Sequence, residues 1–389
     1  MGMDEPDVAS AGTMSRKHRI PMSAPDIQPR DIELVTQALR SGMLSGGPFL
    51  DRLERDFAAY IGVKHAIAVA NGTSGLHLCI RAGAIAGGDE VITTPFSFVA
   101  SANCILYERA KPVFVDIDES TVNLDPALAA IAVTGRTRAV LPVHLFGQPC
   151  AMDELRALCG ARGLLLIEDA CEAVGAEYRG RKVGTFGKAA VFAFYPNKPM
   201  TMGEGAIVTT DDPQWASLIR SLRNQGRGDR GVGFAHDHLG YNYRLNEMSA
   251  ALGVAQLERL DELLARRQAV AARYGELLRK VPGVRVRRIA ASTSRMSWFV
   301  YVVQFDPVVD RDRVIAHLDR RGIASRAYFT PIHLQPYYRK RFGFRTGDFP
   351  VGERVAASTL ALPFHANLSR ADIEAVVDAL QSVVDLAAA

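Results

Sequence analysis

The segment Phe192–Ala206 reads FAFYPNKPMTMGEGA, which is unusual for a surface loop. An apolar, strand-like run ends at Pro196, a single lysine follows at position 198, and a glutamate between two glycines comes next. Because lysine is strongly hydrated and usually exposed, one interpretation of Lys198 is a solvated loop residue. The other is an amine kept out of water so that it can act as a nucleophile. The rest of the chain distinguishes the two.

Short apolar runs alternate with helical patterns on both sides of this segment. Examples are HAIAVA at 65–70, GLLLIEDA at 163–170, AAVFAF at 189–194 and AIVTT at 206–210. These runs are apolar throughout instead of alternating with polar residues, which indicates strands buried on both faces. The alternation with helices predicts the α/β class, with a mostly parallel sheet between layers of helices.

The sequence also predicts how the chain divides into domains. A helical pattern runs from about 246 to 281 and predicts one long helix that bridges two domains. After Pro282–Gly283 the pattern changes to short strands and helices. We therefore expect a large α/β domain at 20–260 and a smaller α+β domain at 261–389. Residues 1–19 lack an apolar signal core and are expected to be a flexible tail.

Composition argues against several classes of partner. A net charge of +4 is too mild for a nucleic-acid-binding protein, and the basic run YYRKRFGFR at 337–345 is typical of a solvated helix end. No apolar run approaches the ~20 residues of a membrane span. The five cysteines are odd in number and show no paired spacing, as in a reducing compartment. We therefore expect a cytoplasmic protein without nucleic-acid or membrane partners.

Candidate ligand-binding groups follow the predicted strands, where open α/β sheets bind their ligands. Gly72, Thr73 and Ser74 open a helix after a strand, so they could hold a phosphate, although the same residues also form ordinary helix caps. Asp169 ends a buried strand and needs a partner, which could be a cation, a metal or a set of backbone donors.

Phe98 in TPFSFVAS is an aromatic residue just past another strand, where most such residues belong to the core. Together with Lys198 and the groups above, it completes what pyridoxal phosphate (PLP) requires. The requirements are a phosphate site, an aromatic face for the ring, a carboxylate for the pyridine nitrogen and a lysine for the aldehyde. We therefore expect PLP as the cofactor and no metal.

Several sequence blocks of the chain occur in the same order as in one enzyme family. They are PFSFVASANCILYERAKPVFVDID, IEDACEAVGAEYRGRKVGTFG, FAFYPNKPMTMGEGA and LGYNYRLNEMSAALGVAQLERL. From about Ile20 to the C-terminus the chain resembles the DegT/DnrJ/EryC1/StrS family, the sugar aminotransferases of fold type I. The resemblance implies that Lys198 forms a Schiff base with PLP, that Asp169 meets the pyridine nitrogen and that Phe98 stacks on the ring. Residues 72–74 would hold the phosphate.

The resemblance also implies that Asn242 reaches the phosphate across a homodimer interface. Three residues depart from the common family pattern. Ala193 replaces a serine that contacts the phosphate, and Ala206 replaces the last glycine of GEGG. Glu172 replaces a glutamine near the phenolic oxygen of the cofactor, where a carboxylate would be protonated, displaced or able to accept a proton.

The implied activity is transfer of an amino group from L-glutamate, or another amino acid, to a keto sugar. We expect a nucleotide-linked 3- or 4-keto-deoxysugar, used for amino-sugar, polysaccharide or antibiotic biosynthesis. Two alternatives are a keto-cyclitol acceptor and a PLP-binding regulator without turnover, although no helix-turn-helix region supports a regulator. Sugar specificity is expected in the stretches 43–48 and 328–338.

Other polar residues have more than one interpretation. His333 could reach the sugar or be a hydrogen-bonded loop residue, and the pair His236 and His238 lacks the third ligand of a metal site. Three arginines are candidates to bind a donor carboxylate or a nucleotide phosphate, namely Arg223, Arg227 and Arg244.

Overall fold

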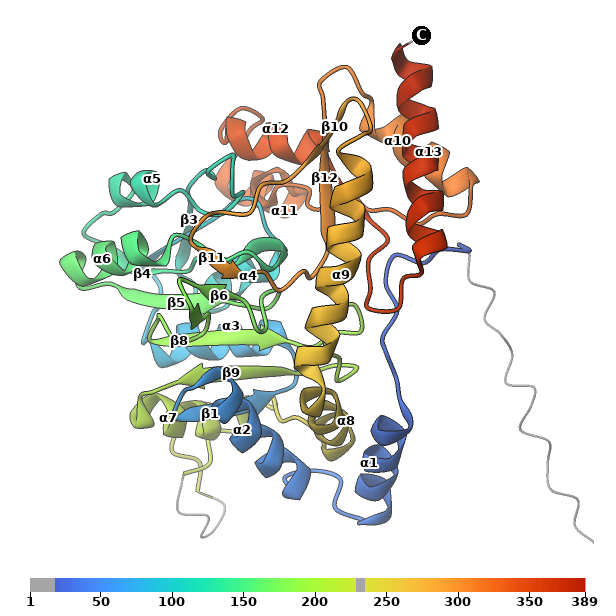
Figure 1. Cartoon of the computed structure of the whole chain (residues 1–389). Helices are drawn as coiled ribbons and strands as arrows, with labels where there is room; N and C mark the ends of the chain where they lie inside the picture. Colours follow the sequence, from blue (N-terminus) through green and yellow to red (C-terminus); the bar gives the residue numbers. More distant parts are fainter. Residues whose placement is uncertain (1–17, 229–234, 389) are drawn as a thin grey trace, which may run out of the picture.

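The structure is a computed structural model that describes residues 18–228 and 235–388. The predicted tail at 1–19 falls outside these ranges except for its last two residues. Figure 1 shows a large sheet covered by helices and a second, smaller sheet, with the long helix α9 (Leu260–Leu278) extending between them. The α/β class predicted from the alternating runs is confirmed.

Within the described residues, the large sheet has seven strands. Their order is β1 (His65–Val69), β9 (Ala206–Thr210), β8 (Ala189–Ala193), β5 (Leu165–Asp169), β4 (Thr137–Val140), β2 (Glu90–Thr93) and β3 (Lys111–Phe114). Only β9 runs against its neighbours β1 and β8, and the other adjacent pairs are parallel. The mostly parallel sheet is therefore confirmed.

Helices cover both faces of this sheet. One face packs against α3 (Gly72–Ala82), α4 (Ala100–Tyr107) and α7 (Pro213–Arg223), and the other against α2 (Pro48–Ile61), α5 (Pro126–Ile131), α6 (Met152–Arg162) and α8 (Glu247–Glu258). Along β8, Val191 belongs to the first core, whereas Ala190 and Phe192 belong to the second. Since successive side chains of a strand point to opposite faces, a strand between two cores must be apolar throughout.

The predicted single helix at 246–281 is wrong. It is two helices, because α8 ends at Glu258 and α9 spans Leu260–Leu278. Arg259 between them leaves helical geometry, with φ −124° and ψ 19°. Its guanidinium donates to the buried carboxylates of Asp26 at 2.7 Å and Asp31 at 3.0 Å. These partners lie more than 200 positions away in sequence, so a helical period cannot reveal the break.

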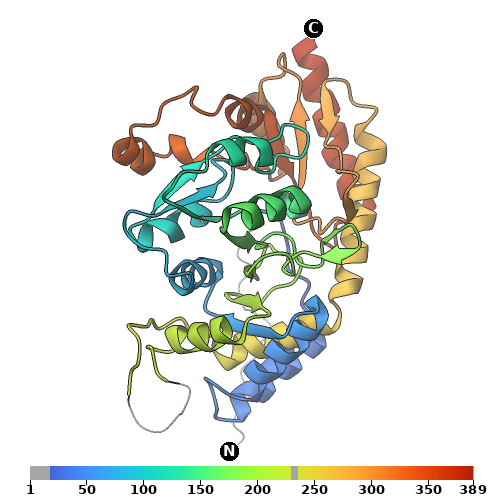
Figure 2. The same cartoon turned by 90° about the vertical axis from the view of Figure 1, so that its left-hand side faces the viewer.

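Helix α9 leads to the second sheet, along one side of the molecule (Figure 2). That sheet has the order β10 (Val284–Val286), β12 (Tyr301–Phe305) and β13 (Thr359–Leu362), and its core includes residues of α10 (Arg311–Arg320) and α13 (Arg370–Ala388). The predicted division near residue 260 falls between α8 and α9 and stays a prediction. The remaining elements are α1 (Pro29–Arg40), β6 (Glu177–Tyr178), β7 (Arg181–Lys182), β11 (Thr293–Arg295), α11 (Pro336–Phe342), α12 (Pro350–Ser358) and short 3₁₀ turns at Leu145–Gly147 and Ile332–Leu334.

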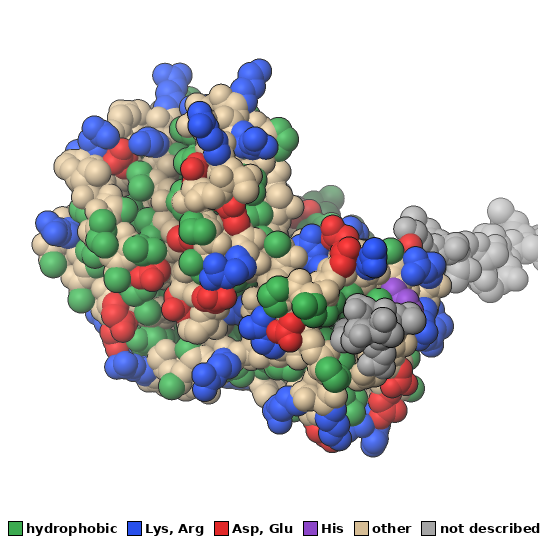
Figure 3. Space-filling view, turned by 90° about the horizontal axis from the view of Figure 1, so that it is seen from above, with side chains coloured by type: hydrophobic (Ala, Val, Ile, Leu, Met, Phe, Trp, Pro, Cys, Tyr) green, Lys and Arg blue, Asp and Glu red, His purple; other side chains and the backbone are tan. Residues whose placement is uncertain are grey.

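The described part of the chain contains no helix that is both long and apolar enough to cross a membrane. All five cysteines are unpaired thiols. On the face drawn in Figure 3, acidic and basic side chains are intermixed.

A buried carboxylate joins the N-termini of helices α8 and α2. Glu247, the first residue of α8, is fully buried and accepts the backbone N–H groups of Gly47 and Phe49 at 2.9 Å and of Leu50 at 3.1 Å. These amides form the N-terminus of α2, where the helix dipole favours a negative charge.

We expect Glu247→Gln to lower the free energy of unfolding by about 1–3 kcal/mol, because an amide group would face donors that need an acceptor. Urea unfolding measures the loss. Glu262→Gln on the exposed surface of α9 is the control, since its side chain is 61% exposed. Equal losses in the two variants would contradict this role for Glu247.

Candidate active site

Three chain segments meet at one end of the large sheet. A Cβ atom at Gly72, the first residue of α3, would lie 2.9 Å from the Cβ of Ala193 and 3.1 Å from the Sγ of Cys171. Ala193 ends β8, and Cys171 follows Asp169 at the end of β5. The segments that carry the predicted phosphate site, carboxylate and lysine are therefore in contact, and a side chain larger than that of glycine would separate them.

The N-terminus of α3 has donors available for an anion. Asn71 caps the helix, and its Oδ1 accepts both the backbone N–H of Ser74 at 2.9 Å and its hydroxyl at 3.0 Å. The first amides of a helix, here those of Gly72 and Thr73, have no acceptor within the helix. Gly72 and Thr73 can therefore donate to a phosphate, whereas Ser74 would first have to leave Asn71.

Asp169 is buried at the end of β5, with 4% of its surface exposed. Its Oδ2 accepts the hydroxyl of Ser101 at 2.7 Å, and its Oδ1 accepts the N–H of Cys171 at 3.1 Å. Within the described residues no ion pair involves this carboxylate. A buried carboxylate with two neutral donors is costly, so the site is suited to a cationic partner such as a protonated pyridine nitrogen. Sequence reasoning missed Ser101, whose only signal is a hydroxyl near the start of α4.

The neighbouring Glu168 holds this end of β5 in place. Its buried carboxylate accepts the N–H groups of Gly184, Phe186 and Gly187, each at 2.8 Å, and the Nε2–H of His144 at 3.0 Å. Burial raises the pKa of Glu168, but the hydrogen bonds from His144 and the amides outweigh burial and lower the pKa overall. Asp169 therefore follows a firmly held residue.

Lys198 is not a solvated loop residue. Only 11% of its side chain is exposed, and its Nζ lies 3.8 Å from Oε1 of Glu172. The same atom lies 3.7 Å from the centroid of the Phe299 ring. The amine is therefore enclosed by a carboxylate and an aromatic face, as the nucleophile interpretation requires.

Glu172 is buried beside Lys198, and its Oε2 accepts the N–H of Phe146 at 2.8 Å. Burial raises the pKa of this carboxyl group, and the nearby Lys198 amine and Phe146 amide only partly offset that effect. The Glu172 side chain therefore stays in the site, and its neighbours only partly offset the cost of burying its negative charge.

Two predicted residues lie at the surface of the single chain. Phe98 is 57% exposed, and its backbone carbonyl lies 3.2 Å from the hydroxyl oxygen of Ser101. Asn242 is exposed in an extended segment that pairs with Asn224. The ring of Phe98 is thus open to a ligand, and Asn242 is open to a second molecule.

The structure shows the surroundings of the two alanines that differ from the common family pattern, Ala206 and Ala193. Ala206 begins β9 and pairs with Val69 and Ala193 in regular antiparallel registers, so this position needs no left-handed backbone. Ala193 ends β8 against Gly72, and its methyl group offers no hydroxyl to a ligand at that point.

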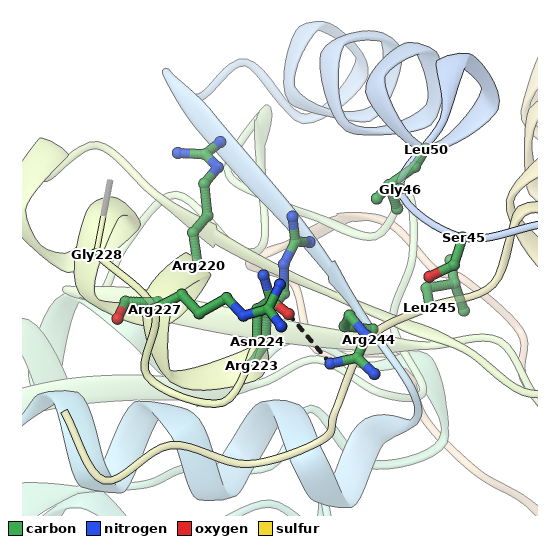
Figure 4. A pocket seen from close by; sticks show the side chains of 11 residues that line it. Ser45, Gly46, Leu50, Arg220, Arg223, Asn224, Arg227, Gly228, Arg244 and Leu245 are labelled. Atoms are coloured by element: carbon green, nitrogen blue, oxygen red, sulfur yellow. Dashed lines mark hydrogen bonds between the residues drawn. The ribbon is translucent and has the colours of Figure 1, made fainter. Parts of the chain in front are cut away.

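The three candidate arginines line one hollow of about 270 Å³, together with Arg220. Arg223 and Arg220 both pair with Glu54, so their charges are partly neutralised. Figure 4 shows Arg227 and Arg244 directed toward Asn224, whose Oδ1 accepts from Arg244 at 3.1 Å. No carboxylate belongs to the described lining, so the hollow favours an anion.

The histidines singled out in the sequence have other partners. His333 is fully buried and its Nε2 pairs with Glu353 at 2.9 Å, which favours the loop interpretation over contact with a sugar. His238 Nδ1 lies 3.0 Å from the hydroxyl of Ser221, and His236 Nδ1 lies 2.8 Å from a backbone carbonyl. Across the described ranges, no group of three or more His, Cys, Asp or Glu residues could hold a metal ion.

These groups fit PLP. A buried amine, a buried carboxylate without a cation and the free amides of a helix N-terminus meet at one end of the sheet, which suits an aldehyde, a pyridine nitrogen and a phosphate.

Comparisons with known proteins agree with this fit. GDP-perosamine synthase of Caulobacter vibrioides is 41% identical over 374 residues, which cover 95% of this chain and 100% of that protein. The spore coat polysaccharide biosynthesis protein SpsC of Bacillus subtilis is 38% identical over 382 residues, covering 95% and 98%. The crystal structure of DesV of S. venezuelae, in complex with a ketimine intermediate, superposes with a TM-score of 0.85 at 38% identity, covering 90% and 93%.

The sequence profile of one family matches residues 25–381. The chain belongs to the DegT/DnrJ/EryC1/StrS aminotransferase family, whose members depend on PLP.

Proposed function

We propose that this aminotransferase moves an amino group from L-glutamate to a nucleotide-linked keto-deoxysugar. The observation that supports the proposal most is the enclosed amine of Lys198 at the sheet end that also holds Asp169 and the start of α3. PLP, when bound there, supplies an electron sink for the carbon that loses and gains a proton.

Lys198 has two roles in this proposal. Its amine would hold the aldehyde, and once released by the amino donor it would carry a proton to and from the substrate carbon. Asp169, which accepts the Ser101 hydroxyl, would keep the pyridine nitrogen protonated. Gly72 and Thr73 would donate to the phosphate, and the exposed ring of Phe98 would contact the cofactor.

The acceptor is proposed from the relatives and from the arginine hollow. The Caulobacter relative is named for a GDP-linked amino sugar and the Bacillus relative for polysaccharide biosynthesis. A hollow with four arginines and no carboxylate in its described lining suits the diphosphate of such a substrate. We propose that a homodimer is the active form, because exposed Asn242 would then reach the partner's phosphate.

Two alternatives remain as outcomes of the test. A relative from Geobacillus stearothermophilus, 37% identical over 354 residues, is named a pleiotropic regulatory protein. A regulator would bind PLP without turnover. A keto-cyclitol aminotransferase would turn over only with a carbocyclic acceptor.

The test follows the visible absorbance of the purified enzyme. L-Glutamate should bleach a band near ~420 nm, and a nucleotide-linked keto sugar should restore it. Lys198→Arg should lower turnover about 10²–10⁴-fold, because the proton carrier is lost. Lys188→Arg, at a lysine paired with Asp212, is the control. No bleaching with any amino acid would favour the regulator, and restoration by keto-cyclitols alone would overturn the sugar assignment.

The raised pKa of Glu172 predicts a pH dependence of stability. Above the ordinary value of 4.5 the unfolded chain releases this proton, whereas the folded protein retains it until the higher folded pKa. Stability contributed by this group therefore falls as the pH rises through that window. In cofactor-free protein, the unfolding free energy of Glu172→Gln relative to wild type should increase from pH 4.5 upward and then level off. A pH-independent difference would contradict the burial argument.

A further inference from the structure

We propose that the ring of Phe299, held by Arg267, is a rest site for the Lys198 ammonium whenever that amine is not bound to the cofactor. The role of the cofactor in this proposal rests on the function proposed above. Sequence reasoning gave Phe299 no role, because the run SWFVYVVQF reads as an ordinary buried strand.

The contact has the geometry of a cation–π interaction. The Nζ of Lys198 lies 3.7 Å from the centroid of the Phe299 ring, and Phe299 is only 3% exposed. An aromatic face attracts an ammonium group most strongly where water is excluded. Glu172, with Oε1 at 3.8 Å from the same Nζ, is a second group beside the amine.

Arg267 connects the ring to the loop that carries the amine. It lies on α9 with 2% of its surface exposed, and it donates to the carbonyls of Lys198 and Phe299, both at 3.3 Å, and of Trp298 at 3.1 Å. One guanidinium therefore fixes the backbone on both sides of the contact.

This arrangement is energetically costly, which argues that it does more than fill space. No ion pair is made by Arg267 within residues 18–228 and 235–388, and burial lowers its pKa to about 10. A buried cation without a carboxylate is unfavourable, and apolar residues of similar volume would avoid that cost. The carbonyls that receive the charge belong to the amine's own loop and to the ring's segment.

The ring's segment is itself constrained. Trp298 has φ 52°, a left-handed conformation that is uncommon for a residue other than glycine. The segment is held by the Ser297 N–H to the carbonyl of Gly147 at 3.1 Å and by the Trp298 indole N–H to Gln268 at 2.6 Å. Such strain persists only where the surroundings impose it, and here they direct the ring to Lys198.

The consequence concerns the half of the reaction in which Lys198 is free. When an amino donor displaces it, the amine takes up the proton that the donor's amino group loses, and it rests against Phe299 and Glu172 without leaving the enclosed site. After releasing that proton, the neutral amine is close enough to take a proton from the substrate carbon and to recapture the aldehyde. Phe299 touches the reacting nitrogen, whereas Arg267 acts by positioning.

The experiment uses enzyme treated with L-glutamate, so that the cofactor carries the amino group and Lys198 is free. A pulse of acetic anhydride labels amines, and mass spectrometry measures the rate at Lys198. Phe299→Leu should raise that rate about five- to thirty-fold, because a desolvated cation–π contact is lost. Phe299→Tyr keeps the aromatic face and should restore the wild-type rate.

Phe305→Leu is the matched control, since Phe305 is an equally buried aromatic residue of β12. It should lose stability without changing the labelling rate. Equal rates in Phe299→Leu and Phe305→Leu, or no rescue by Phe299→Tyr, would overturn the rest site. If wild-type enzyme shows no glutamate-dependent absorbance change, the proposed function fails, and the same comparison in cofactor-free protein still decides the rest site.

Discussion

The enclosure of a single amine is the constraint on which the rest of the site depends. Lys198 follows a buried strand, and its Nζ meets the carboxylate of Glu172 and the face of Phe299 instead of water. Removing a lysine from water is unfavourable unless its new neighbours compensate for the lost hydration. The two neighbours come from different parts of the chain, so the amine is enclosed only when the whole fold is formed.

The surrounding buried polar groups mainly fix the positions of Asp169, Lys198 and Phe299. Glu168 accepts four donors and holds the end of β5, so that Asp169 can remain buried with Ser101 as its partner. Arg267 ties the lysine loop to the segment that carries Phe299. A reaction that needs a carboxylate, an amine and an anion site within one cofactor's length benefits from such rigid supports.

The sequence predicted the sheet well because burial on both faces leaves a local signature, as in the run 189–194. It also predicted that Lys198, Asp169 and residues 72–74 share one end of the sheet, because parallel strands direct their carboxyl ends to the same edge. It failed at Arg259, where distant carboxylates break a helical pattern, and it missed Phe299 and Arg267. Their contacts with Lys198 span 101 and 69 positions, and no local pattern records them.

The central claim is that the amine of Lys198 is the group that holds the cofactor. Borohydride reduction of freshly purified enzyme, followed by peptide mass spectrometry, tests it most directly. The account predicts a pyridoxyl group on Lys198 of every loaded chain and on no other residue. A label on a different lysine, or a coloured enzyme that reduction leaves unlabelled, would contradict it.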